Sequence, residues 1–462
     1  ALNVKFQFYQ EDEDAYKLLL AAGDYPDVRV LPQPASVQDY VNQGLLREIP
    51  MDLINNNAPG FVKIINELSP NAWEAFKVGD KLYGLPIVTY DTQGANIGVT
   101  RQDWLDNIGM GDIGNEITFE QLEDMFYKFV NNDPDKNNIK DTHAISKAWE
   151  LDGQLASIIG AYRVMVEAGY GSGWVNVDDQ VVYSPTAPQY KDVLKILQKW
   201  YKDGVVDPEF LTGENKGGYW ALSHDFMNGR IGISGLAAYY HWAPPLNEKD
   251  PGGTIYQEWK KIKPEIEFDK TYTLGKAPVG PKGKSGQLAG ENFSESMVFS
   301  SKCASDDRKV KTILKMLDTF VTDPDYYMFV SYGQKDVNYT LNPDGTYVEM
   351  VKSTEEAFKM GRSVFNFMSL VPERSKKLKG PLFDFGDKYL VNAYTMVSVP
   401  TTDAYAKSYA SLQKLTAETY FNIITGEQSV DSFDEFVKTF MGNGGEEIIQ
   451  QTQEEWRKIT AK

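Results

Sequence analysis

The sequence predicts an α/β fold that is divided into two domains. The chain has 462 residues, of which 42% are hydrophobic and 24% are charged, and this length can bury two sizeable cores. Strand and helix patterns alternate near the N-terminus. Residues 3–8 (NVKFQF) have the two-residue period of a strand, residues 14–23 read as a helix that Gly23 stops, and residues 28–31 (VRVL) form another strand pattern. This alternation is typical of α/β domains.

The most strongly patterned segment is a helix predicted over residues 117–130 (ITFEQLEDMFYKFV). Its apolar side chains recur every three or four residues and therefore share one face of a helix. They are Phe119, Leu122, Met125, Phe126, Phe129 and Val130. Thr118 and Gln121 can form a capping box at its start, in which each side chain accepts a hydrogen bond from the other residue's backbone N–H.

Later segments continue the α/β pattern. We predict a strand at residues 82–88, an amphipathic helix at 188–204, a buried strand at 230–240, a helix pair at 310–330 that breaks near Pro324, and mainly helical structure at 406–440. Gly426 should end one C-terminal helix, and Ser432 should cap the next. Residues 278–295, which are rich in Gly, Pro and Lys, should run over the surface or between domains.

Composition argues against several classes of function. The chain has 65 acidic and 47 basic residues, and its net charge of -18 repels nucleic acids and anionic membrane surfaces. Cys303 is the only cysteine, and because no basic cluster adjoins it we interpret it as a structural thiol. No apolar run approaches the ~20 residues of a membrane span, and the first ten residues lack a signal-peptide pattern. We therefore expect a soluble chain.

Catalytic motifs give little support to an enzyme. The three histidines, His143, His224 and His241, are far apart and follow no zinc-binding spacing. The sequence has no GxSxG elbow, Walker loop or GxGxxG fingerprint. A glycosidase needs only two carboxylates at a defined separation, so a carbohydrate-active enzyme (a glycosidase or lyase) with an aromatic-lined cleft stays open as an alternative.

Residues 131–142 (NNDPDKNNIKDT) have the spacing of a calcium loop. In such loops, carboxylate, amide and carbonyl oxygens at alternate positions converge on a hard cation. The candidate ligands at the first, third, fifth, seventh and ninth places are Asp133, Asp135, Asn137, the backbone carbonyl of Ile139, and Asp141.

Two positions depart from an EF-hand. Asn138 replaces the glycine at the sixth place, and Ala144 stands where a bidentate glutamate belongs. Asn tolerates the left-handed conformation, so the first change is mild, whereas the second requires another ligand to complete the shell. The segment that follows, residues 143–149, looks like a strand instead of a second helix. We interpret the loop as a structural Ca²⁺ site, with a solvated Asn/Asp turn as the alternative.

Several stretches together resemble one known family. They are residues 23–28 (GDYPDV), 40–50 (YVNQGLLREIP), 81–92 (KLYGLPIVTYDT), 99–110 (VTRQDWLDNIGM) followed by 117–142, 197–210 (LQKWYKDGVVDPEF) and 422–440 (NIITGEQSVDSFDEFVKTF). This combination is similar to the extracellular solute-binding proteins of ABC sugar importers (family 1), in the branch of long members that includes LplA-like lipoproteins and alginate-binding proteins. The loop at residues 133–141 coincides with the calcium loop of that branch.

The resemblance implies a two-lobed periplasmic-binding-protein-like fold of type II. Residues 1–90 and 292–345 would form the N-terminal lobe, without the family's first strand and helix, and residues 91–291 and 346–462 the C-terminal lobe. The chain would cross between lobes near Val88–Gln93, Gly290–Ser294 and Asn342–Val348. The expected protein is a monomeric receptor with no catalytic activity. It would close a hinge around an oligosaccharide, dock on the permease subunits of an ABC transporter, and be held outside the cell by a lipid anchor.

Candidate sugar contacts lie at the crossings and among aromatic residues in polar surroundings. Sugar binding combines flat apolar faces with a few planar hydrogen-bonding groups. The candidates are Tyr90 and Asp91 at the first crossing, Glu291, Asn292 and Phe293 at the second, the run Tyr239, Tyr240, His241 and Trp242 after a predicted strand, and the weaker candidates Trp220 and Trp174. Strand alternation would send part of the 239–242 run into the core.

Overall fold

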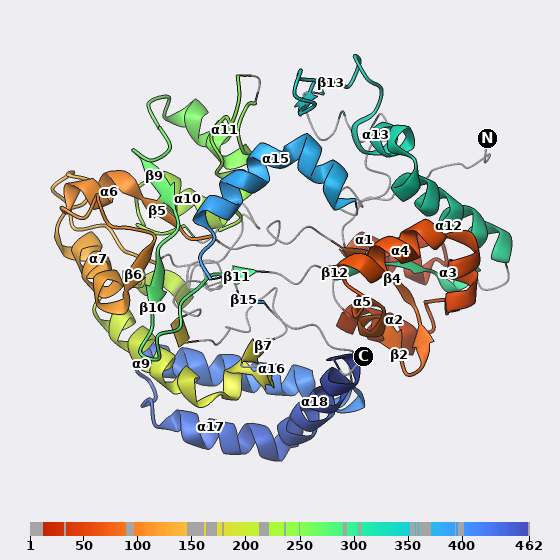
Figure 1. Cartoon of the computed structure of the whole chain (residues 1–462). Helices are drawn as coiled ribbons and strands as arrows, with labels where there is room; N and C mark the ends of the chain where they lie inside the picture. Colours follow the sequence, from red (N-terminus) through yellow and green to blue (C-terminus); the bar gives the residue numbers. More distant parts are fainter. Residues whose placement is uncertain are drawn as a thin grey trace.

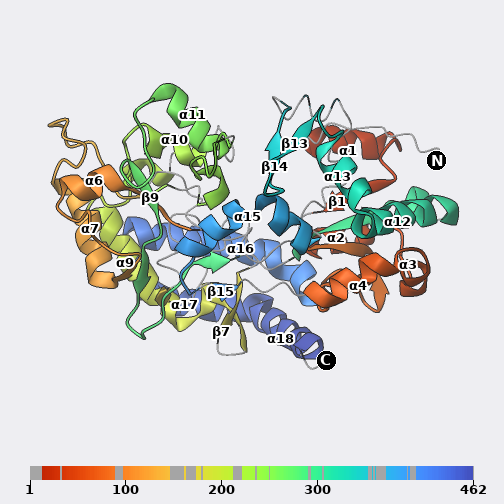
Figure 2. The same cartoon turned by 45° about the horizontal axis from the view of Figure 1, so that its top comes forward.

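The computed structural model describes residues 13–31, 34–88, 97–145, 161–162, 173–177, 180–211, 221–234, 237–248, 250–289, 293–303, 306–351, 356, 359, 371–392, 394–395 and 402–460. These residues form two groups of helices and strands (Figure 1). Helix α15 (Pro372–Tyr389) lies between the two groups, as Figure 2 also shows from a second direction.

The first group is built on a three-stranded antiparallel sheet. Strand β12 (Phe293–Phe299) lies between β1 (Val28–Leu31) and β4 (Gly84–Val88), and Met297 pairs with both Val30 and Leu85. Pro86 is accommodated because β4 is an edge strand, where a missing backbone N–H costs little. The other elements are α1 (Glu13–Ala21), α2 (Pro34–Asn42), α3 (Met51–Asn57), α4 (Pro59–Leu68), α5 (Ala72–Ala75), the hairpin of β2 (Lys77–Val78) and β3 (Lys81–Leu82), α12 (Asp307–Thr322), α13 (Pro324–Tyr332), and the hairpin of β13 (Tyr339–Leu341) and β14 (Tyr347–Glu349).

One hydrophobic core joins these segments, which are far apart in the sequence. It contains residues of β1 and β4, residues of β12, and the apolar faces of α4 and α12. Cys303 lies in this core, and burial raises the pKa of its thiol to about 11. The prediction of a structural thiol is therefore consistent with its surroundings.

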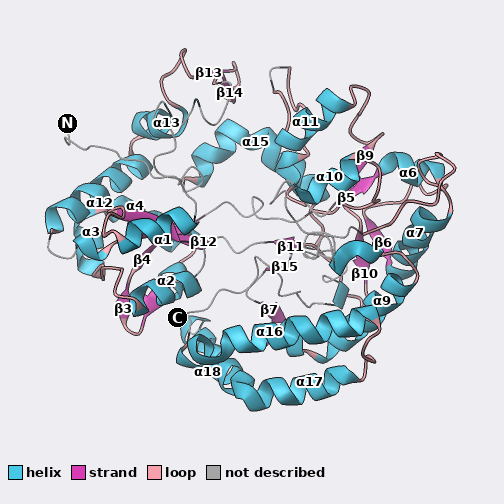
Figure 3. Cartoon of the chain, turned by 180° about the vertical axis from the view of Figure 1, so that it is seen from behind, coloured by secondary structure: helices cyan, strands magenta, loops and turns pink. Residues whose placement is uncertain are grey.

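The second group contains short strand pairs covered by helices. Strands β5 (Val99–Arg101) and β9 (Tyr272–Leu274) are antiparallel, β6 (Glu116–Thr118) and β10 (Ala277–Val279) are parallel, β7 (Trp174–Val177) and β8 (Gln180–Tyr183) form a hairpin, and β11 (Leu288–Ala289) runs parallel to β15 (Tyr394–Thr395). The helices are α6 (Gln102–Asn107), α7 (Phe119–Asn131), α9 (Pro188–Lys202), α10 (Ala221–Met227), α11 (Thr254–Ile262), α16 (Asp403–Thr425), α17 (Ser432–Phe440) and α18 (Glu446–Thr460). This group also has a short 3₁₀ turn at Tyr239–His241 (η4), whereas the 3₁₀ turn Ser301–Cys303 (η5) belongs to the first group. Figure 3 shows α16, α17 and α18 together at one edge of this group.

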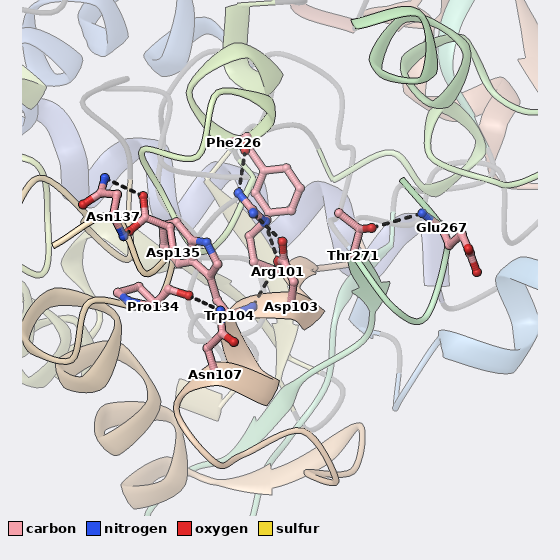
Figure 4. A network of polar contacts seen from close by, with 10 residues as sticks. All are labelled: Arg101, Asp103, Trp104, Asn107, Pro134, Asp135, Asn137, Phe226, Glu267 and Thr271. Carbon is pink, nitrogen blue, oxygen red and sulfur yellow. Dashed lines mark hydrogen bonds and ion pairs between the residues drawn. The ribbon is translucent and has the colours of Figure 1, made fainter. Parts of the chain in front are cut away.

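Two hydrophobic cores lie within the second group. The larger joins α7, α9, α16 and α17, and the smaller joins β5, β9, α11 and the 3₁₀ turn at residues 239–241. Arg101 is buried beside the smaller core, where Asp103 accepts a hydrogen bond of 2.7 Å from its Nε atom (Figure 4). Its guanidinium also lies 4.9 Å from the ring centroid of Trp104. The ion pair with Asp103 and the contact with the Trp104 ring offset the cost of burying the positive charge of Arg101.

Helix α15 packs against a core of each group. Leu378 belongs to the core of the first group, and the hydroxyl of Ser375 lies 3.3 Å from that of Tyr327. In the other half of the helix, Phe385 and Tyr389 pack against the smaller core of the second group. Between the two halves the helix is kinked. Lys379 has non-helical angles (φ -123°, ψ 17°), and Pro381 removes a backbone donor.

Most of the predicted local elements are confirmed. The helix predicted at residues 117–130 is α7, which carries both hydrogen bonds of the Thr118–Gln121 capping box. The break at Pro324 separates α12 from α13, and Gly426 ends α16 in a left-handed conformation with φ 84°. Ser432 is the first residue of α17, and the capping position belongs to Asp431.

Two predicted elements differ from the structure. Residues 231 and 233 make isolated bridges instead of a continuous strand. Residues 342–348 were expected to cross between lobes, but they form the turn and part of the second strand of the β13–β14 hairpin. Tyr347 packs against the first core there, with its ring 4.4 Å from that of Tyr332. The strand predicted at residues 3–8 lies outside the described residues. None of the helices described is long and apolar enough to cross a membrane.

Replacing the cap of α7 should destabilise the second group. Thr118→Ala removes the acceptor for the Gln121 N–H, which is 3.1 Å away, and should cost about 1 kcal/mol of unfolding free energy. Urea denaturation followed by circular dichroism measures the change. Thr118→Ser keeps the hydroxyl oxygen and serves as the control, and equal loss in both variants would contradict the capping role.

Candidate functional site

The candidate calcium loop begins where α7 ends and is fixed at three points. Asn107 in α6 donates from Nδ2 to the carbonyl of Pro134 at 2.6 Å, as Figure 4 shows. After the loop, the hydroxyl of Thr142 donates to the Phe129 carbonyl at 2.7 Å, which closes the loop against the last turn of α7. The His143 N–H then bonds to the carbonyl of Arg230. The loop therefore leaves and re-enters the core of the second group at defined places.

The backbone of the loop turns through three left-handed residues. Asp133, Lys136 and Asn138 have φ values of 46°, 58° and 64°. Asn138 holds the sixth place, where EF-hand loops have glycine, so the expected left-handed conformation is present there. Asp and Asn tolerate this region better than most residues, because their short polar side chains bond to nearby backbone groups. The sharp turn of a calcium loop is therefore formed without its glycine.

Carboxylate oxygens in the loop accept hydrogen bonds from its own backbone. Asp133 accepts from the N–H groups of Asn137 and Asn138, both at 3.0 Å. The Ile139 N–H donates to Oδ1 of Asn137 at 2.6 Å. These bonds tie the side chains of Asp133 and Asn137 to the loop's own backbone. Every ligand candidate keeps some solvent exposure, and Ile139 is 60% exposed.

The amide of Asn137 lies between two carboxylates. Its Nδ2 atom is 2.8 Å from Oδ2 of Asp135 and 3.3 Å from Oδ1 of Asp141 (Figure 4 shows the first of these contacts). Burial, together with the charges of Asp141 and Asp133, raises the pKa of Asp135 above its ordinary value, even though the Asn137 N–H partly offsets the shift. A cation would relieve this crowding of negative charge.

The donor atoms fit a hard cation by type, but they are not gathered around a common point. Among the residues that the structure describes, no three His, Cys, Asp or Glu side chains are arranged to hold a metal ion. The Asn137 amide presents its NH₂ group to the carboxylates, and a ligand at the fifth place must present its oxygen. Cation binding would therefore require the Asn137 side chain to turn.

The aromatic run at residues 239–242 has two buried and two accessible side chains. Tyr239 and Trp242 are 0% exposed and belong to the smaller core of the second group. Tyr240 is 37% exposed, and the ring of His241 lies 4.2 Å from it. The run forms a 3₁₀ turn, in which residues three apart share a face. The buried and accessible side chains therefore do not alternate as they would in a strand. Burial lowers the pKa of His241 to about 4, which leaves its imidazole neutral.

The remaining sugar-contact candidates are placed only in part. Tyr90, Asp91, Trp220, Glu291 and Asn292 lie outside the described residues. Phe293 begins β12 and pairs with Val88. Trp174 is 1% exposed and packs against Tyr183, so its ring is part of the core. The roles of these residues in ligand binding stay predictions.

Two features with functional potential were not singled out from the sequence. Asn107, which anchors the loop, looks like an ordinary helix-end amide, and only the tertiary contact reveals it. The basic segment 374–379 (RSKKLK) is visible in the sequence, but its place in the kinked helix between the two groups is not.

Comparisons with known proteins give a consistent family likeness along the whole chain. The chain is 22% identical over 457 residues to the polygalacturonan/rhamnogalacturonan-binding protein YtcQ of Bacillus subtilis (strain 168), covering 96% of this chain and 83% of that protein. It is 21% identical over 462 residues to the lipoprotein LipO of the same strain, covering 95% and 82%. No model of a known protein family matches the chain.

Solved structures show the same likeness in three dimensions. The alginate-binding protein AlgQ2 without calcium ion has a TM-score of 0.64 at 17% identity, covering 96% of this chain and 88% of that one. An EF-hand mutant of the S. pneumoniae ABC-transporter substrate-binding protein FusA, in complex with fructo-nystose, has a TM-score of 0.65 at 16% identity, covering 98% and 92%. The chain therefore has the two-lobed α/β fold of the solute-binding proteins of ABC transporters, and the resemblance seen in the sequence is confirmed.

The left-handed turn of the loop gives a test that needs no metal. In chelator, Asn138→Ala should lower the free energy of unfolding by about 1 kcal/mol, because alanine is disfavoured at φ 64°. Asn138→Gly should be tolerated, since glycine adopts this conformation freely. Urea unfolding curves of the two variants give the comparison, and an alanine variant as stable as the glycine variant would contradict the described turn.

Proposed function

We propose that this chain, which has the fold of the solute-binding proteins of ABC transporters, is an extracellular receptor that captures an oligosaccharide between its two lobes and delivers it to an ABC transporter permease. The likeness along 96% of the chain to a polygalacturonan/rhamnogalacturonan-binding protein carries the proposal. Two structures of FusA with TM-scores of 0.65 and 0.64 support it, since fructo-nystose is bound in one and kestose in the other.

The path of the chain supports closure of two lobes about a hinge. Val88 lies in the core of the first group and Ile97 in a core of the second, so the chain passes between the groups within residues 89–96. Ala289 pairs with Thr395 in the second group, and Phe293 starts the central strand of the first, which gives another passage. We place the third passage after β14, in α15, instead of at residues 342–348.

These passages define the proposed lobes. Residues up to about 90 and from 292 to the end of β14 would move as one lobe, and residues 91–291 with the C-terminal helices would move as the other. The proposed mechanism is capture in the open form, hinge closure, and docking of the closed form on the permease. Hydroxyl contacts would set specificity, and Tyr240 and His241 offer an accessible aromatic pair for a sugar face.

We also propose that the protein acts outside the cell as a lipid-anchored monomer. A curated relative is named as a lipoprotein, which supports an anchor on the outer face of the membrane. Permease subunits would be the protein partner. The relatives compared are binding proteins, which favours a receptor over the carbohydrate-active enzyme that the sequence left open.

The loop at residues 133–141 is proposed to hold a structural Ca²⁺ ion. Asp133, Asp135, Asn137, the carbonyl of Ile139, and Asp141 would supply the oxygens, after Asn137 turns its amide. The ion would neutralise the crowded carboxylates and brace the loop after α7. A solved structure of AlgQ2 is described as lacking calcium ion and a FusA variant as an EF-hand mutant, which supports calcium binding within this fold.

Incubation with a mixture of oligosaccharides tests whether the protein is a receptor or an enzyme. Incubation with pectic, alginate, fructan and milk oligosaccharides should return every component unchanged by mass spectrometry. At least one should raise the melting temperature, since a ligand at 100 times its Kd stabilises the folded state by about 2.7 kcal/mol. Cleavage of an oligosaccharide at catalytic protein concentration would overturn the receptor proposal. The proposal would also fail if none of the components raised the melting temperature.

Calcium should stabilise the intact protein but not a loop variant. Adding 1 mM Ca²⁺ after chelation should raise the melting temperature of the unchanged protein, whereas Asp133→Ala combined with Asp135→Ala should melt alike in both conditions, because two carboxylate ligands are lost. Asp112→Ala, which removes a charge outside the loop, is the control and should respond like the unchanged protein. If chelated and calcium-treated protein unfold at the same temperature, the proposed site is wrong.

A further inference from the structure

A short basic segment stands out in this acidic chain. Residues 374–379 (RSKKLK) contain four basic and no acidic side chains, whereas the whole chain has a net charge of -18. The segment lies in the first half of α15, the helix that packs against a core of each group. Basic charge is therefore concentrated on a segment that links the two lobes, where the proposed ligand would be held.

The side chains of this segment divide into two sets. Ser375 and Leu378 are buried and attach the helix to the first core, while Lys376 and Lys377 are exposed to solvent. Lys379 belongs to neither set, because it lies at the kink, where the backbone leaves helical geometry just before Pro381. Its side chain is half-buried at the point where α15 passes from one core to the other.

Among the residues that the structure describes, no carboxylate forms an ion pair with the ammonium group of Lys379. Glu349 in β14 is the acid whose charge acts on it, but the carboxylate of Glu349 already accepts hydrogen bonds from the N–H groups of Met350 at 3.1 Å and Val351 at 3.0 Å. Burial lowers the pKa of Lys379, which reflects the cost of keeping the charge away from water. An anionic ligand would compensate that cost.

We propose that Lys379 binds a carboxylate of the captured sugar, so that the ligand is an acidic, uronate-containing oligosaccharide. The overall negative field of the protein repels such a ligand, and a local cation between the lobes would offset that repulsion near the ligand carboxylate. A charge-assisted hydrogen bond from Nζ to the uronate is stronger than a bond to a hydroxyl group. This inference rests on the proposed function as an oligosaccharide receptor.

Calorimetric titration with matched ligands tests the inference. The probes are oligogalacturonates and oligoalginates of two to six sugars, the same oligomers after methyl esterification, and neutral fructo-oligosaccharides. The acidic oligomers should bind the intact protein, and esterification should weaken binding by about tenfold or more. Lys379→Gln should weaken binding of the acidic form by a similar factor and leave the esterified form nearly unchanged.

Two further variants act as controls. Lys376→Gln removes the same charge from an exposed position of the same helix and should change the affinity by less than about threefold, as expected of a screened surface charge. Lys379→Arg keeps the positive charge and should retain most of the affinity, and melting curves establish that each variant is folded.

The outcomes distinguish this inference from the proposed function. Equal affinity for acidic and esterified oligomers, or equal losses in Lys376→Gln and Lys379→Gln, would overturn the role of Lys379. Binding of neutral oligosaccharides alone would overturn the ligand class and leave the receptor function intact. If no oligosaccharide of any kind binds, the proposed function itself fails.

Discussion

The architecture depends on the position of β12 in the middle of the first sheet. This strand pairs with β1 on one side and β4 on the other, yet the whole β5–β11 part of the second group lies between β4 and β12 in the chain. The sheet can be completed only if the chain leaves the first group, builds most of the second, and returns. This strand order requires one passage out of the first group and another back into it. It also means that each group is built from segments that are separate in the sequence.

Local elements could be predicted from the sequence because their determinants are close together. The apolar period of α7, its Thr118–Gln121 box and the left-handed Gly426 act within one or two turns of helix. Strand alternation did not describe residues 239–242. They begin with a 3₁₀ turn, which directs Tyr239 and Trp242 to the same side. The spacing of residues 133–141 predicted an oxygen-rich turn, whereas the orientation of the Asn137 amide depends on hydrogen bonds that spacing does not determine.

Contacts between segments that are far apart in the sequence were harder to predict. The family resemblance implied a third passage at residues 342–348, and the sequence of this polar turn between aromatic residues does not reveal which core those residues join. Tyr347 packs against Tyr332, so the hairpin belongs to the first group, and α15 makes the link instead. Lys379 became informative only through its place at the kink, since the same basic segment on an exposed helix would be an ordinary solvated face.

The single cysteine has a practical consequence. Cys303 follows β12 in the 3₁₀ turn Ser301–Cys303, its sulfur lies 3.6 Å from Oδ1 of Asp27, and its thiol is buried with a raised pKa. A thiol reagent should therefore react only when β12 separates from its neighbours or the first group opens. The labelling rate of this one thiol would therefore report how often the first group opens around Cys303.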